Sequence, residues 1–251
     1  MPDHLREIEL VEAFARLDVA RRERTGIPET VFAEGKTADQ VISILGSLCE
    51  KSGVALGTRV SQECAQRAEE VLGSERKVRY HNMARTIIVE KPDHSIVPTG
   101  GVIAILSAGT GDLPVAEEAK VTAEVMGCKV LTFYDVGVAG IHRLVEPLKA
   151  ILEQEVSAVV VVAGMEGALP SVVRGLLPIP VIGVPTSVGY GYGAKGEAAL
   201  MSMLQSCSPG LTVVNIDNGF GAGATAALIA NRVSAAQRTN SNGKNSNLGG
   251  G

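Results

Sequence analysis

A single cysteine near the end of the patterned part of the chain has the clearest nucleophilic potential. Cys207 lies in the stretch SCSPGLTVVNIDNGFGAGA, just before a Pro-Gly turn, an apolar run and several glycines. A thiolate is a strong nucleophile that forms covalent intermediates with electrophilic substrates. Cysteine is also commonly a small, buried apolar residue, so the residue type leaves both roles open.

A glycine-rich turn offers a candidate phosphate site. The sequence SAGTGDLPVAEEA follows an apolar run, and its small residues leave backbone N–H groups accessible where a helix is predicted to begin. The turn has neither the G-x-G-x-x-G pattern nor the lysine of a P-loop, so tight packing is the alternative. The candidate phosphate-binding residues are Ser107, Gly109, Thr110, Gly111 and Asp112.

Two other segment ends carry candidates for proton transfer and anion binding. YDVGVAGIHRL places His142 and Arg143 at the start of a predicted helix, where imidazole can exchange a proton and guanidinium can grip phosphate. AGMEGALPS places Glu166 after another apolar run, where a carboxylate is a candidate base. A solvent-facing His-Arg pair and a glutamate that interacts with a helix dipole are the alternatives.

A turn near the C-terminus adds two polar candidates. Asp217 and Asn218 precede the glycines of NIDNGFGAGA, a spacing that resembles a nucleotide-contacting turn, although Asx-Gly turns are common in α/β proteins. Asp112 and Asp217 could each ligate Mg²⁺ through oxygen. The sequence leaves any metal requirement unknown.

These candidates require a scaffold that gathers the ends of separate segments. From about residue 100, five β-branched runs alternate with amphipathic stretches, which predicts right-handed βαβ units in one parallel sheet. We therefore expect an α/β domain over residues 100–234, with a parallel five-stranded, Rossmann-like sheet flanked by helices. Ligands of such sheets bind at the carboxyl ends of the strands. On this basis Ser107, His142, Glu166 and Cys207 are expected to meet at one edge.

The rest of the chain has a different pattern. Residues 1–99 combine helix-like and strand-like stretches and predict a small α+β domain, with EKPDHSIVPTG as the linker. Residues 235–251 are polar and glycine-rich, which predicts a disordered tail.

Composition excludes several classes of function. A net charge of -4 and a pI near 5.7 give no basic footprint for nucleic acid. The acidic N-terminus lacks a signal-peptide pattern, and no uncharged apolar run is long enough to cross a bilayer, so we expect a cytoplasmic protein without membrane contact. The four cysteines form no C-x-x-C pair, which argues against a disulfide framework or a zinc site.

Residues 100 to about 232 resemble the PurE-type aminoimidazole ribonucleotide carboxylases. SAGTGD resembles their phosphate loop, GIHRL is similar to their Ser-Ala-His-Arg, and LPIPVIGVPTS is similar to their fourth strand. The family's Gly-Gly-Ala-Ala-His-Leu-Pro is shortened here to GMEGALPS, without the histidine, and its Met-Pro is replaced by Ser206 and Cys207.

With the leading LDVARRERTGIPETVFAEGKT, these departures make residues 1 to about 232 resemble the LarB family of nickel-pincer cofactor biosynthesis. The resemblance implies carboxylation of nicotinic acid adenine dinucleotide at carbon 5 of the pyridinium ring, with CO₂ or bicarbonate as co-substrate and no permanently bound cofactor. Hydrolysis of the phosphoanhydride would then release AMP and pyridinium-3,5-biscarboxylic acid mononucleotide. It also implies a homo-octamer.

The resemblance assigns roles to residues of this chain. The Cys207 thiolate would add to the ring, and Glu166 or His142 would remove the carbon 5 proton. The N-terminal motif maps onto Asp18, Arg21 and Arg24, among others, and its arginines would suit the phosphates or carboxylate of the dinucleotide. A charged turn that caps a helix is the alternative for this motif. A PurE-type carboxylase or mutase and a non-catalytic nucleotide sensor are the competing functions.

Overall fold

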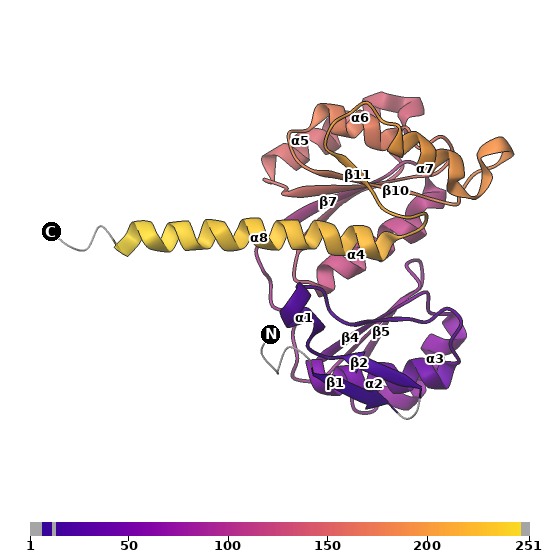
Figure 1. Cartoon of the computed structure of the whole chain (residues 1–251), viewed down its shortest axis with the longest axis vertical. Helices are drawn as coiled ribbons and strands as arrows, with labels where there is room; N and C mark the ends of the chain where they lie inside the picture. Colours follow the sequence, from indigo (N-terminus) through magenta and orange to yellow (C-terminus); the bar gives the residue numbers. More distant parts are fainter. Residues whose placement is uncertain (1–6, 12–13, 247–251) are drawn as a thin grey trace. The chain divides into compact units, whose positions relative to one another are not determined.

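The computed structural model describes residues 7–11 and 14–246, and the chain divides into two compact units after Ile96 (Figure 1). The sequence pattern predicts this division after residue 99. The second unit contains one five-stranded sheet in which every neighbouring pair is parallel. Its strands are β7 (Val102–Ser107), β8 (Lys129–Phe133), β9 (Ala158–Ala163), β10 (Val181–Pro185) and β11 (Leu211–Val213). The predicted α/β fold is confirmed.

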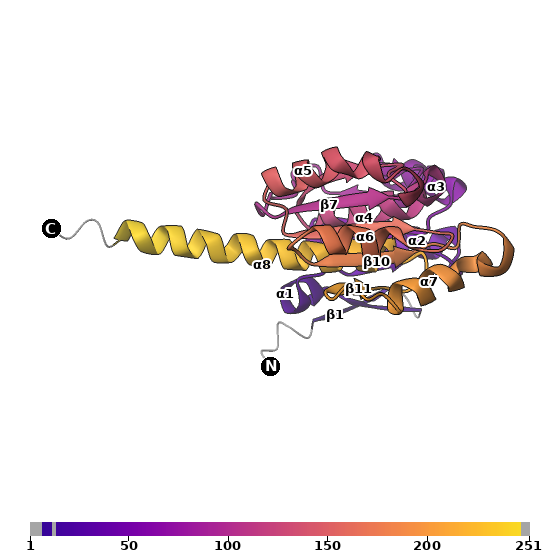
Figure 2. The same cartoon turned by 90° about the horizontal axis from the view of Figure 1, so that it is seen from above.

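The sheet is buried on both faces, as its sequence requires. Strand β9 reads AVVVVA with all six residues buried, the pattern of a central parallel strand rather than one with a solvent face. One face packs against α5, α6 and α7, and the other against α4 and α8 (Figures 1 and 2). The helices are α4 (Leu113–Val125), α5 (Val145–Glu153), α6 (Leu169–Leu176), α7 (Glu197–Leu204) and α8 (Gly219–Ser246).

Strand order fixes where a ligand can bind. The order is β11-β10-β9-β7-β8, so the chain moves from β7 outward to β8 and then crosses back to β9 on the other side of β7. This reversal is the switch point of a flavodoxin-like doubly wound sheet, where loops diverge and leave a crevice at the carboxyl ends of the strands. Short 3-10 helices follow three of the strands: η2 (Thr110–Asp112), η3 (Val138–Leu144) and η4 (Gly191–Gly196).

Helices α4 and α8 pack through glycines. A Cβ at Gly223 would lie too close to the backbone carbonyl oxygen of Ala119, and Gly219 faces the same constraint at Val115. The buried carboxylate of Glu118 accepts a hydrogen bond from the Phe220 N–H at 3.2 Å, which satisfies a backbone donor in the first turn of α8. This close packing fixes the start of α8 against α4.

The Gly223→Ala substitution is expected to lower the free energy of unfolding by about 1–3 kcal/mol, because the added methyl group meets backbone that cannot move aside. Gly175→Ala in α6 is the matched control, since no atom lies within 4 Å of its added Cβ. The control should be neutral or stabilising by up to about 1 kcal/mol, because alanine favours helix. Chemical denaturation of both variants measures the difference, and equal midpoints would refute the packing argument.

The C-terminal segment is helical where disorder was predicted. Helix α8 continues through Ser246, so the predicted disordered tail is wrong for residues 235–246, and residues 247–251 lie outside the described residues. Ser234 anchors the middle of the helix by donating to the Thr99 carbonyl oxygen at 2.8 Å. Elongating an existing helix needs no new nucleation, so polar residues of modest propensity can extend it.

The first unit is a small α+β domain, as predicted. It contains the antiparallel pair β1 (Ile8–Val11) and β2 (Ala15–Asp18) and a mixed four-stranded sheet of order β3-β4-β6-β5. The sheet strands are β3 (Thr30–Phe32), β4 (Val54–Thr58), β5 (Lys77–His81) and β6 (Thr86–Glu90). Its helices are α1 (Arg21–Thr25), α2 (Ala38–Ser52) and α3 (Gln62–Leu72). Across residues 7–11 and 14–246, no helix is both long and apolar enough to cross a membrane.

Candidate active site

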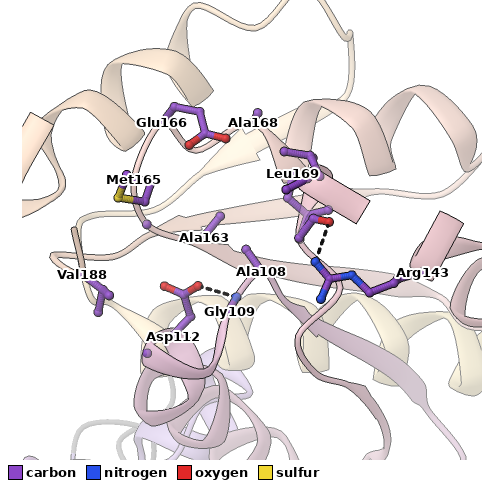
Figure 3. Close-up of a pocket in the computed structure, with 15 residues that line it drawn as sticks. Ala108, Gly109, Asp112, Arg143, Ala163, Met165, Glu166, Ala168, Leu169 and Val188 are labelled. Atoms are coloured by element: carbon purple, nitrogen blue, oxygen red, sulfur yellow. Dashed lines mark hydrogen bonds between the residues drawn. The ribbon is translucent and has the colours of Figure 1, made fainter. Parts of the chain in front are cut away.

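A pocket of about 280 Å³ occupies the predicted crevice (Figure 3). Its walls come from the loops that follow β7, β8, β9 and β10, so four separate segments of the sequence meet at the switch point of the sheet. Most of the lining residues are apolar and a few are polar, which is usual for a small-molecule site. The lining includes Gly109, Gly111, Asp112, Arg143, Glu166, Met165, Leu169 and Val188.

The turn after β7 is organised by a buried carboxylate. Asp112 Oδ2 accepts a hydrogen bond from the Gly109 N–H at 2.9 Å, and Asp112 Oδ1 accepts one from Thr186 Oγ1 at 2.6 Å. Burial raises the pKa of Asp112, and the hydrogen bonds from Thr186 and Gly109 oppose that rise. Asp112 therefore joins the β7 and β10 loops. Its Oδ2 also takes up the Gly109 N–H, which was predicted to bind phosphate.

The burial of the Asp112 carboxylate can be tested through the pH dependence of protein stability. Because its pKa is raised in the folded protein, Asp112 contributes stability that is full below the ordinary aspartate pKa of about 3.9 and is lost as pH rises through the folded pKa. The unfolding free energy of wild type minus that of the Asp112→Asn variant should therefore increase as pH falls from 7 to 4. Urea unfolding across that range measures it, and a shift in the opposite direction would contradict the assignment.

Arg143 lies at the pocket wall but is already hydrogen-bonded. Its Nη1 donates to the Asp135 carbonyl oxygen at 2.6 Å and lies 3.2 Å from Asp135 Oδ2, while Nη2 donates to the Gly137 carbonyl oxygen at 3.3 Å. A guanidinium has five N–H donors. Arg143 can thus hold the β8 loop and still present donors to an anion in the pocket.

Glu166 is exposed at the pocket, on the loop that follows β9 (Figure 3). The preceding Met165 has a φ of +50°, and Asp135 and Asp217, in the loops after β8 and β11, have φ of +56°. Aspartate tolerates left-handed backbone, whereas this conformation is costly for methionine, so the strain beside the pocket is at Met165.

Other predicted site residues lie beside the pocket rather than in its wall. Ser107 is fully buried and its Oγ accepts the Asp135 N–H at 3.4 Å, so it supports the β8 loop. Thr110 and His142 are exposed and do not line the pocket. Of the two candidate bases, only Glu166 faces the cavity.

The Asp-Asn pair before α8 has local structural partners. Asp217 Oδ1 accepts the Ser187 N–H at 2.8 Å, which ties the β11 loop to the β10 loop. Asn218 Oδ1 accepts the Gly221 N–H at 2.8 Å and caps α8. Sequence reasoning missed Thr186, which holds Asp112, and the apolar walls Met165 and Val188. Their positions directly after predicted strands were the available signal.

Cys207 lies at the opposite edge of the sheet, and the prediction that it joins Ser107, His142 and Glu166 at one rim is wrong. It stands before β11, whereas the pocket residues follow their strands. Cys207 lines a separate hollow with Arg174 and Pro178, at the amino end of β10, and that five-residue strand alone spans about 13 Å at roughly 3.3 Å per residue. The reading as a buried apolar residue is also wrong, because Cys207 is exposed while Cys49, Cys64 and Cys128 are buried.

The N-terminal motif forms an ion-pair cluster within its own unit. Arg24 hydrogen-bonds both carboxylate oxygens of Asp18, and Arg21 Nε lies 3.4 Å from Asp18 Oδ2 and 2.8 Å from Glu29 Oε2. Hydrogen bonding from Arg24 lowers the pKa of Asp18, whereas burial raises the pKa of Glu29. The two arginines are therefore neutralised locally before any ligand is considered.

No group of three or more metal-ligating side chains occurs within residues 7–11 and 14–246. Asp112 already accepts two hydrogen bonds, so its oxygens are poorly placed to serve Mg²⁺ as well.

Fold and pocket together define the class of doubly wound α/β proteins that hold a small ligand at the strand ends. Comparison with known proteins narrows this class. Residues 102–247 match the family described as AIR carboxylase, and residues 8–91 match the LarB/PurE-like N-terminal domain. The chain belongs to the AIR carboxylase family, and its combination of domains is the LarB architecture.

Two relatives show how far the likeness extends. The chain is 48% identical to an uncharacterized protein of Methanocaldococcus jannaschii over 88% of this chain and 86% of that protein. It is 34% identical to a probable N5-carboxyaminoimidazole ribonucleotide mutase of Methanothermobacter thermautotrophicus over 51% of this chain and 37% of that protein. The second likeness is thus partial, whereas the first spans both units.

Proposed function

We propose that this protein carboxylates the pyridinium ring of nicotinic acid adenine dinucleotide at carbon 5 and hydrolyses the phosphoanhydride to release AMP. The observation that carries the proposal is the pocket at the switch point, where Arg143 and Glu166 face a cavity in a chain with the LarB domain combination. The β7 turn and Arg143 would hold phosphate, and Glu166 would stand beside the ring.

The chemistry needs a nucleophile because a pyridinium ring is electron-poor and does not attack CO₂. Addition of a thiolate to a neighbouring ring carbon forms a C–S bond and moves an electron pair into the ring, so that carbon 5 becomes an enamine nucleophile. Carbon 5 then bonds to CO₂, loses its proton to a base, and aromaticity returns as the C–S bond breaks and the thiolate leaves. Water completes the separate cleavage of the phosphoanhydride.

Cys207 can supply this thiolate only if another copy of the chain brings it to the pocket. The thiol is exposed but lies at the opposite edge of its own sheet. Leu176, Met201 and Leu204, on the α6 and α7 helices near it, are exposed as well, which suits a contact between copies. We therefore infer a shared site in a homo-oligomer, in which one copy contributes the pocket and another contributes the thiol.

Incubation with substrate and bicarbonate separates the candidate functions. The proposal predicts AMP and a carboxylated pyridinium mononucleotide from nicotinic acid adenine dinucleotide, and no turnover of aminoimidazole ribonucleotide. Turnover of the latter alone would instead support the mutase activity suggested by the partial relative. Binding of either compound without turnover would favour a nucleotide sensor.

The Arg143→Lys variant should bind the dinucleotide about tenfold more weakly although the charge is kept, because lysine cannot form two parallel hydrogen bonds to phosphate or hold the β8 loop. Arg79→Lys is the matched control, since Arg79 lies in β5 of the first unit, where its Nη2 pairs with Glu90 Oε2 at 2.7 Å, and it does not line the pocket. Calorimetric titration compares the two. Equal affinities in both variants would remove Arg143 from the phosphate site.

A further inference from the structure

The segment that follows β10 exposes two tyrosines that the protein does not use for packing. Residues 187–196 read SVGYGYGAKG, and Tyr190 is 80% exposed while Tyr192 is fully exposed. The chain has only four tyrosines, four phenylalanines and no tryptophan. Aromatic side chains normally contribute large buried areas. Two exposed rings within three residues therefore require another explanation.

The other two tyrosines show what a structural role looks like here. The Tyr80 hydroxyl donates to the Val60 carbonyl oxygen at 2.9 Å, and the Tyr134 hydroxyl bonds to Glu117. Neither Tyr190 nor Tyr192 makes a hydrogen bond within the described part of the chain. Their rings are thus available to a ligand.

The base of this segment is fixed to the pocket. Val188 lines the cavity, and its carbonyl oxygen accepts the Met165 N–H at 3.1 Å. The neighbouring Ser187 N–H donates to Asp217 at 2.8 Å. Tyr190 is therefore attached two residues from the pocket wall, within reach of its opening.

Beyond that base, the backbone can turn. Gly191 has a φ of +73°, a region that glycine enters without strain, whereas Gly196, with a φ of +83°, packs closely against the Thr186 carbonyl oxygen and Ile216. No atom lies within 4 Å of a Cβ built on Gly191, so packing does not hold this part in place. The segment is thus held at Val188 and Gly196, and its one glycine without packing contacts, Gly191, lies between the two tyrosines.

The pocket also lacks a component that its proposed ligand needs. Its volume of about 280 Å³ is at the lower limit for ligand sites, and none of its lining residues is aromatic. A planar aromatic cation is bound well by the face of an aromatic side chain. The walls supply the carboxylates of Asp112 and Glu166, the Arg143 guanidinium and aliphatic groups, but no aromatic face.

We propose that residues 187–196 form an aromatic strap that closes over the pocket and stacks a tyrosine on the planar, positively charged ring of the substrate. This inference rests on the proposed function, because it names the part of the same site that recognises the pyridinium. The strap would select the cationic ring over its neutral, reduced form, and it would enlarge the contact area of a cavity whose volume is at the lower limit for ligand sites.

Calorimetry in bicarbonate-free buffer tests this proposal without turnover. The probes are nicotinic acid adenine dinucleotide and NAD, which carry cationic rings, and NADH, whose ring is neutral. The double variant Tyr190→Leu, Tyr192→Leu should bind the cationic probes about tenfold more weakly and NADH unchanged. The matched double variant with phenylalanine keeps both rings and should stay within about twofold of wild type. Chymotrypsin cleavage after Tyr190 and Tyr192 should slow when wild type is saturated with NAD.

Equal affinity of the leucine and phenylalanine variants for the cationic probes would overturn the strap. So would loss of the oligomer in the leucine variant alone, which would make the tyrosines contacts between copies. Tyrosine-dependent binding without carboxylation would refute the proposed function and leave the strap standing. Carboxylation together with binding that does not depend on the tyrosines would refute the strap and support the proposed function.

Discussion

The Cys207→Ser variant is expected to lose carboxylation by about 10³-fold or more while folding normally. Serine is nearly the same size as cysteine, but its hydroxyl is a far weaker nucleophile and does not form the ring adduct. Because Cys207 is exposed and makes no core contact, the unfolding transition should not move. Mass spectrometry of product and denaturation of the same samples measure both effects.

The burial of the other thiols supplies a control on wild-type protein. Cys49, Cys64 and Cys128 are buried, so iodoacetamide should alkylate the native protein at Cys207 first. Single modification there should abolish carboxylation, and substrate should protect against it. Full activity after stoichiometric alkylation of Cys207 would show that the thiol is not the nucleophile.

A mixing experiment tests whether the site is shared between copies. Cys207→Ser retains the pocket and Glu166→Gln retains the thiol, so co-assembled variants should rebuild about a quarter of the sites if the two groups come from different copies. Each variant alone should stay inactive. No recovery in verified mixed oligomers would contradict the shared site.

The Glu166→Gln variant is expected to lose about 10²-fold or more in product formation, the usual effect of removing a general base. Glutamine cannot accept the carbon 5 proton, so aromaticity would not return after carboxylation, and the cysteine adduct should accumulate. Intact-protein mass spectrometry detects that adduct. His142→Gln is the paired variant, and it should keep near wild-type rates because His142 does not line the pocket. Loss of activity in the His142 variant alone would transfer the role of base to that residue.

The hydrophobic pattern predicted the scaffold well because the central strands β7, β9 and β10 are buried along most or all of their length. A run such as the AVVVVA of β9 is compatible with few structures other than a central strand between helical segments. Glu166 follows the carboxyl end of this strand, so its place at the crevice could be predicted from the sequence. The same rule gave Arg143 and the Gly109 turn, which all follow strands of one parallel sheet.

The rule failed where a residue stands before its strand. Cys207 precedes β11, so its own sheet carries it to the opposite edge, and chain order was the signal that should have prevented the error. Hydrogen bonding between distant segments was also beyond the reach of sequence. Nothing in the spacing shows that Asp112 accepts a hydrogen bond from Thr186, because this partner lies 74 residues away on another loop. The bonds of Asp112 to Gly109 and of Asn218 to Gly221 are local, and the Asn before α8 was the available capping signal.

The most direct test of the proposed function is the fate of labelled bicarbonate. Wild-type protein would be incubated with nicotinic acid adenine dinucleotide and ¹³C-bicarbonate, and the nucleotide products analysed by mass spectrometry and ¹³C NMR. The proposed function predicts one labelled carboxylate on carbon 5 of a pyridinium mononucleotide, together with an equal amount of AMP. Release of AMP with only unlabelled nicotinic acid mononucleotide would show a hydrolase without carboxylation and would contradict the proposed function.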